Sequence, residues 1–226
     1  MAVKLKSDSN ILAMFEYVKK YLAETNGEST DWEIAELGGR FPFRKRSEHT
    51  WRVLAWADRL INEGIYDVDI DKEAILIAAV FHDVGYGLSE TGADHHEKSA
   101  LVFNEYAEQN GIETDTRKLV DYLLRNHSNG AILHDAGTPL ELVVLMEADK
   151  LDESGAMSIL WDCMAEGSMN EQSYLKTFER IKEYSGAILG KNPMRTETAK
   201  KYWTIKQGLV REFVDQLELD LVLHYT

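Results

Sequence analysis

Apolar residues recur every three or four positions along most of this 226-residue chain, and only three prolines interrupt it. That spacing gathers apolar side chains on one face of an α-helix, as in amphipathic helices packed on a shared core. Glycines such as Gly64 and Gly111 end the periodic stretches, in the position where helices commonly stop. The sequence therefore predicts an all-α fold, a bundle of helices.

The chain carries no evident linker, internal repeat or low-complexity segment. Its length is enough for one large domain or two small ones. We expect a single domain over residues 1–226, with the functional core at about residues 45–160. The C-terminal helices, at about 168–226, are expected to pack on that core. A domain boundary near residue 168 is the alternative.

The charge balance of the chain limits which kinds of molecule it is expected to bind. The chain has 39 acidic and 25 basic residues, a formal net charge of −14. A nucleic-acid polymer is not expected, because its binding needs clustered cations. A small phosphorylated molecule stays compatible, since a metal ion can supply local positive charge.

Three further features suggest the compartment. The single cysteine, Cys163, excludes an internal disulfide and a cysteine-based zinc site. The first residues contain no apolar signal region, and no segment reaches the length of a membrane span. We expect a cytoplasmic protein without a membrane partner, and the oligomeric state is left open.

An apolar run from Ala74 to Phe81 ends in the pair His82-Asp83, and Gly85 follows. An ionised carboxylate at the end of a buried helix must be neutralised, and a divalent metal ion is one efficient way to do so. A helix end that faces water is the alternative, because a dipeptide alone is a weak signal.

Other polar residues lie on the inward stripes or at the ends of the expected helices. His49 shares the helical phase of Val53 and Leu60, and Asp149 projects from an apolar stripe. The set consists of His49, His82, Asp83, His96, His127 and Asp149. Four imidazoles and two carboxylates suit two six-coordinate metal ions that share a bridging carboxylate. Chance alignment among seven histidines is the alternative.

The order and context of these residues resemble the HD superfamily of metal-dependent phosphohydrolases. The matching motifs are H-x-x-R-V at 49–53, H-D-V-G at 82–85, H-E-K-S-A at 96–100, N-H-S at 126–128 and A-D-K-L-D-x-x-G-A at 148–156. They span about residues 45–160, and T-E-T-A-K-K at 196–201 resembles a small bacterial branch of these hydrolases. The resemblance implies one or two divalent metal ions, of Mn, Fe, Co, Ni or Mg.

The resemblance also implies a role for each ligand. The first metal would be held by His49, His82, Asp83 and Asp149, and Asp83 would bridge to a second metal held by His96 and His127. His95 competes with His96, and Asp152 competes with Asp149. The helical phase and the H-E-x-S pattern favour His96, and the A-D-x-L pattern favours Asp149.

The implied reaction is hydrolysis of a small phosphorylated substrate, with a nucleotide favoured, by a metal-activated water. Asp83 is the expected catalytic residue. Cations near the ligands are candidate phosphate contacts, although a solvated surface position is the alternative for each. They are Arg44, Arg46, Arg52, Lys98 and Lys150.

Two other functions are compatible with the same ligands. A di-iron centre would use them to activate oxygen, and a non-catalytic sensor domain would keep the metal only as a structural group. The identity of the bound metal and the consumption of oxygen distinguish an oxygenase from a hydrolase.

Overall fold

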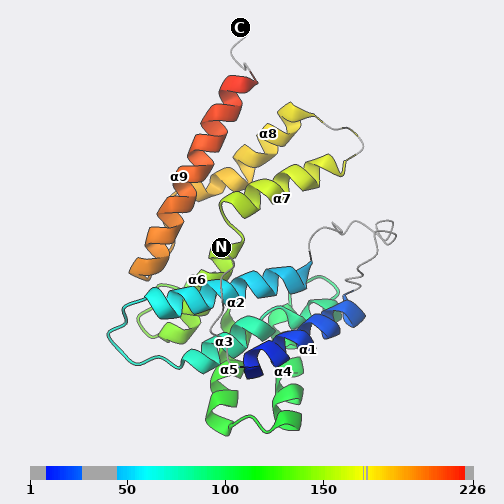
Figure 1. Cartoon of the computed structure of the whole chain (residues 1–226), viewed down its shortest axis with the longest axis vertical. Coiled ribbons are helices and arrows are strands. Elements are labelled where there is room, and N and C mark those ends of the chain that lie inside the picture. Colours follow the sequence, from blue (N-terminus) through cyan, green and yellow to red (C-terminus); the bar gives the residue numbers. More distant parts are fainter. Residues whose placement is uncertain (1–8, 27–44, 170, 172, 222–226) are drawn as a thin grey trace. The chain divides into compact units, whose positions relative to one another are not determined.

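The computed structural model describes residues 9–26, 45–169, 171 and 173–221. Within these ranges every regular element is helical, which confirms the expected all-α fold (Figure 1). The α-helices are α1 (Ser9–Thr25), α2 (Arg46–Glu63), α3 (Lys72–Phe81), α4 (His95–Asn110), α5 (Thr114–Asn126), α6 (Leu140–Asp152), α7 (Ala156–Gly167), α8 (Tyr174–Glu183) and α9 (Glu197–Asp220). The 3₁₀ turns are η2 (Val84–Leu88), η3 (Gly130–Ile132) and η4 (Ser185–Leu189).

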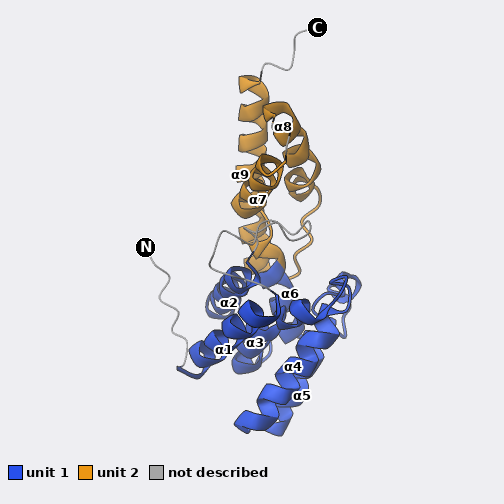
Figure 2. Ribbon diagram, turned by 90° about the vertical axis from the view of Figure 1, so that its right-hand side faces the viewer, with its two compact units in different colours: residues 1–149 blue, residues 150–226 orange. Residues whose placement is uncertain are grey.

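The chain divides into two compact units, residues 1–149 and 150–226 (Figure 2). The division falls at the end of α6 and not near residue 168, where the sequence allowed a boundary. The expectation of one domain over residues 1–226 stays a prediction.

Helix α3 is the centre of the first unit. Its sequence, KEAILIAAVF, is almost wholly apolar, and every residue from Ile77 to Phe81 is buried. Asp71 caps the helix, since its side chain accepts a 2.9 Å hydrogen bond from the Ala74 amide. Helices α1, α2, α4 and α5 pack around α3. The residues that follow its last turn, His82 and Asp83, are therefore buried as well.

The turn after α3 lies directly against the first turns of α4. A Cβ atom built on Gly85 would stand 2.3 Å from the Ser99 amide nitrogen, so no larger residue fits there without a shift. The Gly85 amide donates to Ser99 Oγ at 2.9 Å, and that hydroxyl donates to the His82 carbonyl at 2.7 Å. Glycine at position 85 thus lets the His82-Asp83 segment approach the start of α4.

The second unit is built from α7, α8 and α9, which pack on one another. Phe178 and Ile181 of α8 and Trp203 of α9 are buried in it. A carboxylate is buried there too: Asp162 lies 3.2 Å from Arg180 Nε, and its other oxygen accepts a 2.5 Å hydrogen bond from Ser185 Oγ. This charge is paired and hydrogen-bonded, as a buried carboxylate requires.

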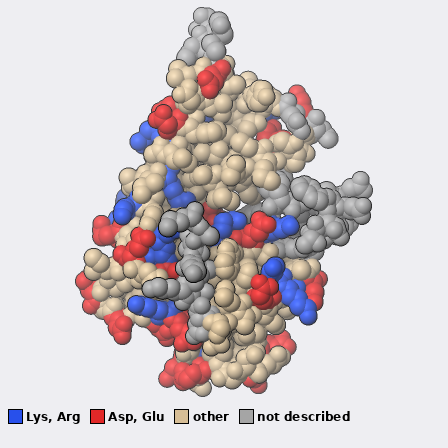
Figure 3. All heavy atoms as spheres, viewed as in Figure 1, with Lys and Arg blue, Asp and Glu red and all other residues tan. Residues whose placement is uncertain are grey.

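On the face drawn in Figure 3, acidic and basic side chains lie interspersed. Among the described helices, none is both long and apolar enough to cross a membrane.

Candidate metal centre

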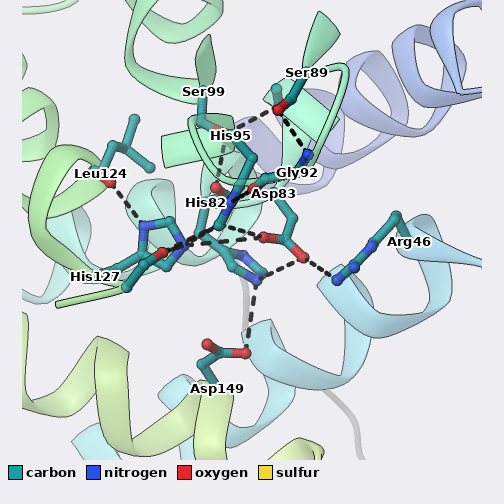
Figure 4. A network of polar contacts seen from close by, with 12 residues as sticks. Arg46, His82, Asp83, Ser89, Gly92, His95, Ser99, Leu124, His127 and Asp149 are labelled. Atoms are coloured by element: carbon teal, nitrogen blue, oxygen red, sulfur yellow. Dashed lines mark hydrogen bonds and ion pairs between the residues drawn. The ribbon is translucent and has the colours of Figure 1, made fainter. Parts of the chain in front are cut away.

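The carboxylate of Asp83 lies between two pairs of imidazole rings (Figure 4). Its Oδ2 atom is 3.4 Å from His49 Nε2 and 3.6 Å from His82 Nε2. Its Oδ1 atom is 3.5 Å from His95 Nε2 and 3.9 Å from His127 Nε2. One carboxylate therefore faces two groups of nitrogen donors, one with each oxygen.

The first group is completed by Asp149, the last residue of the first unit. Its Oδ1 atom lies 3.2 Å from His49 Nε2 and 3.9 Å from His82 Nε2, and the two Nε2 atoms are 3.2 Å apart. A metal ion with bonds of about 2.1 Å holds neighbouring donors about 3.0 to 3.4 Å apart. The three distances from His49 Nε2 to the other donors fall in this range, and the two from His82 Nε2 to the carboxylates, 3.6 and 3.9 Å, are longer.

The second group joins Asp83 to His95 and His127, whose Nε2 atoms are 3.3 Å apart. The hydroxyl of Ser128 lies 3.1 Å and 3.2 Å from these two nitrogens. In the sequence, Ser128 is the last residue of the N-H-S motif, and its position there predicts no role for it. Its position adds an oxygen donor to this group.

Backbone carbonyls hold three of the rings in the orientation that metal binding needs. The Nδ1 atoms of His82, His95 and His127 lie 2.9, 2.7 and 2.7 Å from the carbonyl oxygens of Ala79, Gly92 and Leu124. A carbonyl oxygen only accepts hydrogen bonds, so each Nδ1 carries the proton. The Nε2 lone pair of each ring then points toward Asp83, as is usual for metal-ligating histidines.

The protonation states also suit a cation. Burial, and next the charge of His82, lower the pKa of His127 to about 4. Burial raises the pKa of Asp83, but the charges of His82, Arg46 and His49 more than offset this and leave it well below its usual range. Burial also raises the pKa of Asp149, yet the hydrogen bond from His49 and the charge of His82 lower it to about 2. Near neutral pH the cluster thus combines ionised carboxylates with a neutral His127.

The structure places His95 in the cluster and His96 outside it, and which of the two binds a metal stays a prediction. His95 is the first residue of α4 and shares a face with Ser99, which is bonded to the turn after α3. The His96 Nε2 atom is instead 4.0 Å from Glu97, and its Nδ1 has no hydrogen-bond partner among the described residues. The phase of Ala100 and Phe103 favoured His96, but the buried face of α4 is broad enough to include His95.

Arg46 is the predicted phosphate contact that touches the cluster. Its Nη1 atom donates a 2.8 Å hydrogen bond to Asp83 Oδ2. The guanidinium also lies 3.6 Å from the ring centroid of Tyr86, and this ring stacks on His95 with centroids 4.2 Å apart. Arg46, Tyr86 and His95 thus form a continuous stack, and no motif in the sequence indicated a role for Tyr86.

The other predicted phosphate contacts are placed as follows. Lys98 lies 3.8 Å from Asp94 in an exposed ion pair. Arg52, one turn after His49, and Lys150, next to Asp149, are half-buried. Arg44 lies outside the described residues. A substrate role for these four stays a prediction.

Comparison with known proteins assigns the family. The HD domain model matches residues 46–154, the segment that carries every residue of the cluster. Residues 46–154 of the chain therefore form an HD domain.

Among curated proteins, the bifunctional uridylyltransferase/uridylyl-removing enzyme of Vibrio cholerae is 36% identical over 63 residues. The matched stretch is 28% of this chain and 7% of that enzyme, so only a small part of its length is represented here.

Solved structures resemble nearly the whole chain. An HD-superfamily hydrolase from Bacillus thuringiensis superposes with a TM-score of 0.64 at 19% identity, covering 95% of this chain and 98% of the other. Bacillus subtilis YpgQ in complex with ADP superposes with a TM-score of 0.57 at 18% identity, covering 91% and 97%. At these identities the likeness shows the fold.

Proposed function

We propose that this protein is a metal-dependent phosphohydrolase that acts on a small phosphorylated substrate. The observation that carries the proposal is the position of Asp83, with one carboxylate oxygen toward each pair of imidazole nitrogens. Nitrogen and carboxylate donors of this kind suit Mn, Fe, Co, Ni or Zn, and open positions add Mg. When bound, such ions activate water and offset the charge of a phosphoryl group.

The residues around the cluster have separate tasks in this proposal. The carbonyls of Ala79, Gly92 and Leu124 keep the histidine Nδ1 protons away from the donor atoms. The ionised Asp83 joins the two donor groups. The side chain of Asp149 is 24% exposed, compared with 4% for Asp83, and Ser128 beside the second group is exposed as well, so both groups reach solvent.

Arg46 supplies the cation for the phosphate. Its stack on Tyr86 fixes the plane of the guanidinium, and one amino group already donates to Asp83. A guanidinium has five N–H donors in a rigid fork, a geometry that suits the oxygens of a phosphate next to the cluster. A charge-assisted hydrogen bond of this kind adds both affinity and orientation.

We further propose a nucleotide as the substrate. A nucleotide is a small phosphorylated molecule, which an acidic protein can bind with the help of a metal ion. YpgQ, which shares the fold, was crystallised with ADP. The bifunctional enzyme of Vibrio cholerae removes uridylyl groups by its name, and its similarity to this chain is limited to 63 residues.

The test is elemental analysis of protein purified without chelator, followed by hydrolysis assays with Mn, Co and Mg. One or two metal equivalents with metal-dependent phosphate release from a generic phosphomonoester would support the hydrolase. A panel of nucleoside mono-, di- and triphosphates then tests the substrate class. Release from sugar phosphates but not from nucleotides would contradict the nucleotide proposal alone.

Two results would contradict the hydrolase itself. Two bound irons with oxygen consumption and no phosphate release would assign the same donors to an oxygenase. Metal binding without turnover of any phosphorylated compound would leave a metal-binding sensor domain.

A further inference from the structure

Helix α9 has two apolar faces. One contains Trp203, Val210 and Val214, which are buried in the second unit. A separate stripe on the same helix is formed by Tyr202, Ile205, Leu209 and Phe213, which we call the α9 seam. Its members are three, four and four positions apart, so they lie along one side of the helix.

Three members of the α9 seam are exposed to solvent, and Tyr202 is half-buried. Ile205 is 58% exposed, Leu209 49% and Phe213 38%. Single exposed apolar residues are common, but a regular stripe of large ones is typical of an interaction surface. A helix with such a 3–4 spacing is normally covered by another helix.

Gly208 supports a close neighbour beside this stripe. It lies in the interior of α9, where glycine destabilises a helix relative to alanine because it loses more backbone freedom. A Cβ atom built on it would meet nothing within 4 Å among the residues that the structure describes. The packing of the chain itself therefore gives no reason for glycine here, whereas a second helix crossing at this point would.

The charges of α9 indicate what kind of helix fits. Residues 197–208 contain three lysines and one glutamate, and residues 209–220 contain four acidic residues and one arginine. A parallel copy of this helix would place like charges together. An antiparallel copy places the basic half of each helix against the acidic half of the other, which is favourable at an interface rim.

We propose that two copies of this chain associate through antiparallel contact of their α9 seams. With the two-fold axis beside Gln207 and Gly208, Ile205 lies against Leu209 of the second copy, and Tyr202 lies against Phe213. The same register brings Lys201 near Glu212 of the second copy. Each side of the contact repeats the other, as a two-fold symmetric interface requires.

The first test is sedimentation velocity of the full chain over a range of concentrations. We expect a species of twice the 25.8 kDa chain mass. Leu209→Asp places a charge in the seam and should give a monomer with unchanged helical content by circular dichroism. The matched control is Thr204→Asp, an exposed position on α9 outside the seam, which should leave the dimer intact.

A charge-reversal cycle tests the register. Lys201→Glu and Glu212→Lys should each weaken the dimer by about tenfold, because each creates like-charge contacts at two symmetric places. The double variant restores opposite charges and should recover most of the affinity. If the double variant instead lost affinity by the combined amount of the two single variants, this register would be contradicted.

Cross-linking tests the direction of the helices in a Cys163→Ser background. In the antiparallel pair, Lys201→Cys and Glu212→Cys chains should cross-link to each other when mixed, and neither should cross-link to itself. Positions 201 and 212 are about 16 Å apart along a helix, so a parallel pair gives the reverse result. That reversal, a monomeric wild type, or a Leu209→Asp dimer would each overturn the proposal.

Discussion

Arg46 and the carboxylate of Asp83 form a buried ion pair, in which Arg46 Nη1 donates a 2.8 Å hydrogen bond to Asp83 Oδ2. The same oxygen faces His49 and His82. The guanidinium thus shares the Asp83 oxygen with the first donor group, so a metal ion held there would interact with the same negative charge as Arg46. Under the proposed function, this arrangement would couple substrate contact to metal binding.

Replacing Arg46 by glutamine should affect these two functions in opposite directions. Metal should bind several-fold more tightly, because a neighbouring positive charge is removed. The KM for a phosphorylated substrate should rise roughly ten- to hundredfold, since a charge-assisted hydrogen bond contributes about 1.5–3 kcal/mol. Metal titration and steady-state kinetics measure the two effects. Arg46→Lys is the control, with charge kept and the stack on Tyr86 lost. Weaker metal binding in Arg46→Gln would contradict the coupling.

The neighbouring histidines at the start of α4 provide a matched pair. His95→Gln should remove one donor of the second group and lower the metal content by about one equivalent if the protein binds two ions. His96→Gln should leave the metal content unchanged, because His96 Nε2 lies beside Glu97 and outside the cluster. Elemental analysis of both variants decides between them. Loss of metal in His96→Gln alone would show that His96 is the ligand, as the helical phase predicted.

Asp83→Ala should remove metal from both groups, because each of them uses one of its oxygens. It should also abolish phosphate release. Asp149→Ala should affect the first group alone and retain up to one ion at the second. Equal losses in both variants would mean that the two groups bind metal as a single unit.

The metal-free protein should lose stability between pH 6.5 and pH 4. The pKa of His127 is lowered to about 4 in the fold, so on acidification the unfolded chain takes up a proton first. The neutral His127 contributes its full stabilisation of the fold above about pH 6.5. On acidification below pH 4, the free energy of unfolding would fall by about 3 kcal/mol in total. Urea unfolding with chelator at pH 7.5 and pH 5 measures it. In His127→Gln the difference between the two pH values should shrink; greater stability at pH 5 would show a charged His127 in the fold.

Gly85 should be intolerant of a side chain. A Cβ atom there would lie 2.3 Å from the Ser99 amide nitrogen, so Gly85→Ala must separate the turn after α3 from α4. We expect about 1–3 kcal/mol of destabilisation and reduced metal content, because His95 is on α4. Gly137→Ala is the control, since its Cβ would meet nothing within 4 Å. Urea unfolding and metal analysis compare them, and equal effects would show that the close approach is unimportant.

The sequence by itself determined the helices and the residues that begin and end several of them. The apolar period predicted the all-α fold, and the run from Ala74 to Phe81 became the buried α3. Gly64 and Gly111 follow helix ends as expected. Helical phase also predicted that His49 is buried. These properties depend on local backbone geometry and on the burial of one helical face, which a single sequence records.

The tertiary structure decided which polar side chains meet. His95 and His96 are adjacent on a broadly buried helix, so their phase could not separate them. The approach of α4 to Gly85 selects His95. The donation from Arg46 to Asp83, the place of Tyr86 in the stack and the position of Ser128 beside two imidazoles depend on how separate helices and turns pack. Such contacts join residues far apart in the chain, and only the packed fold fixes their distances.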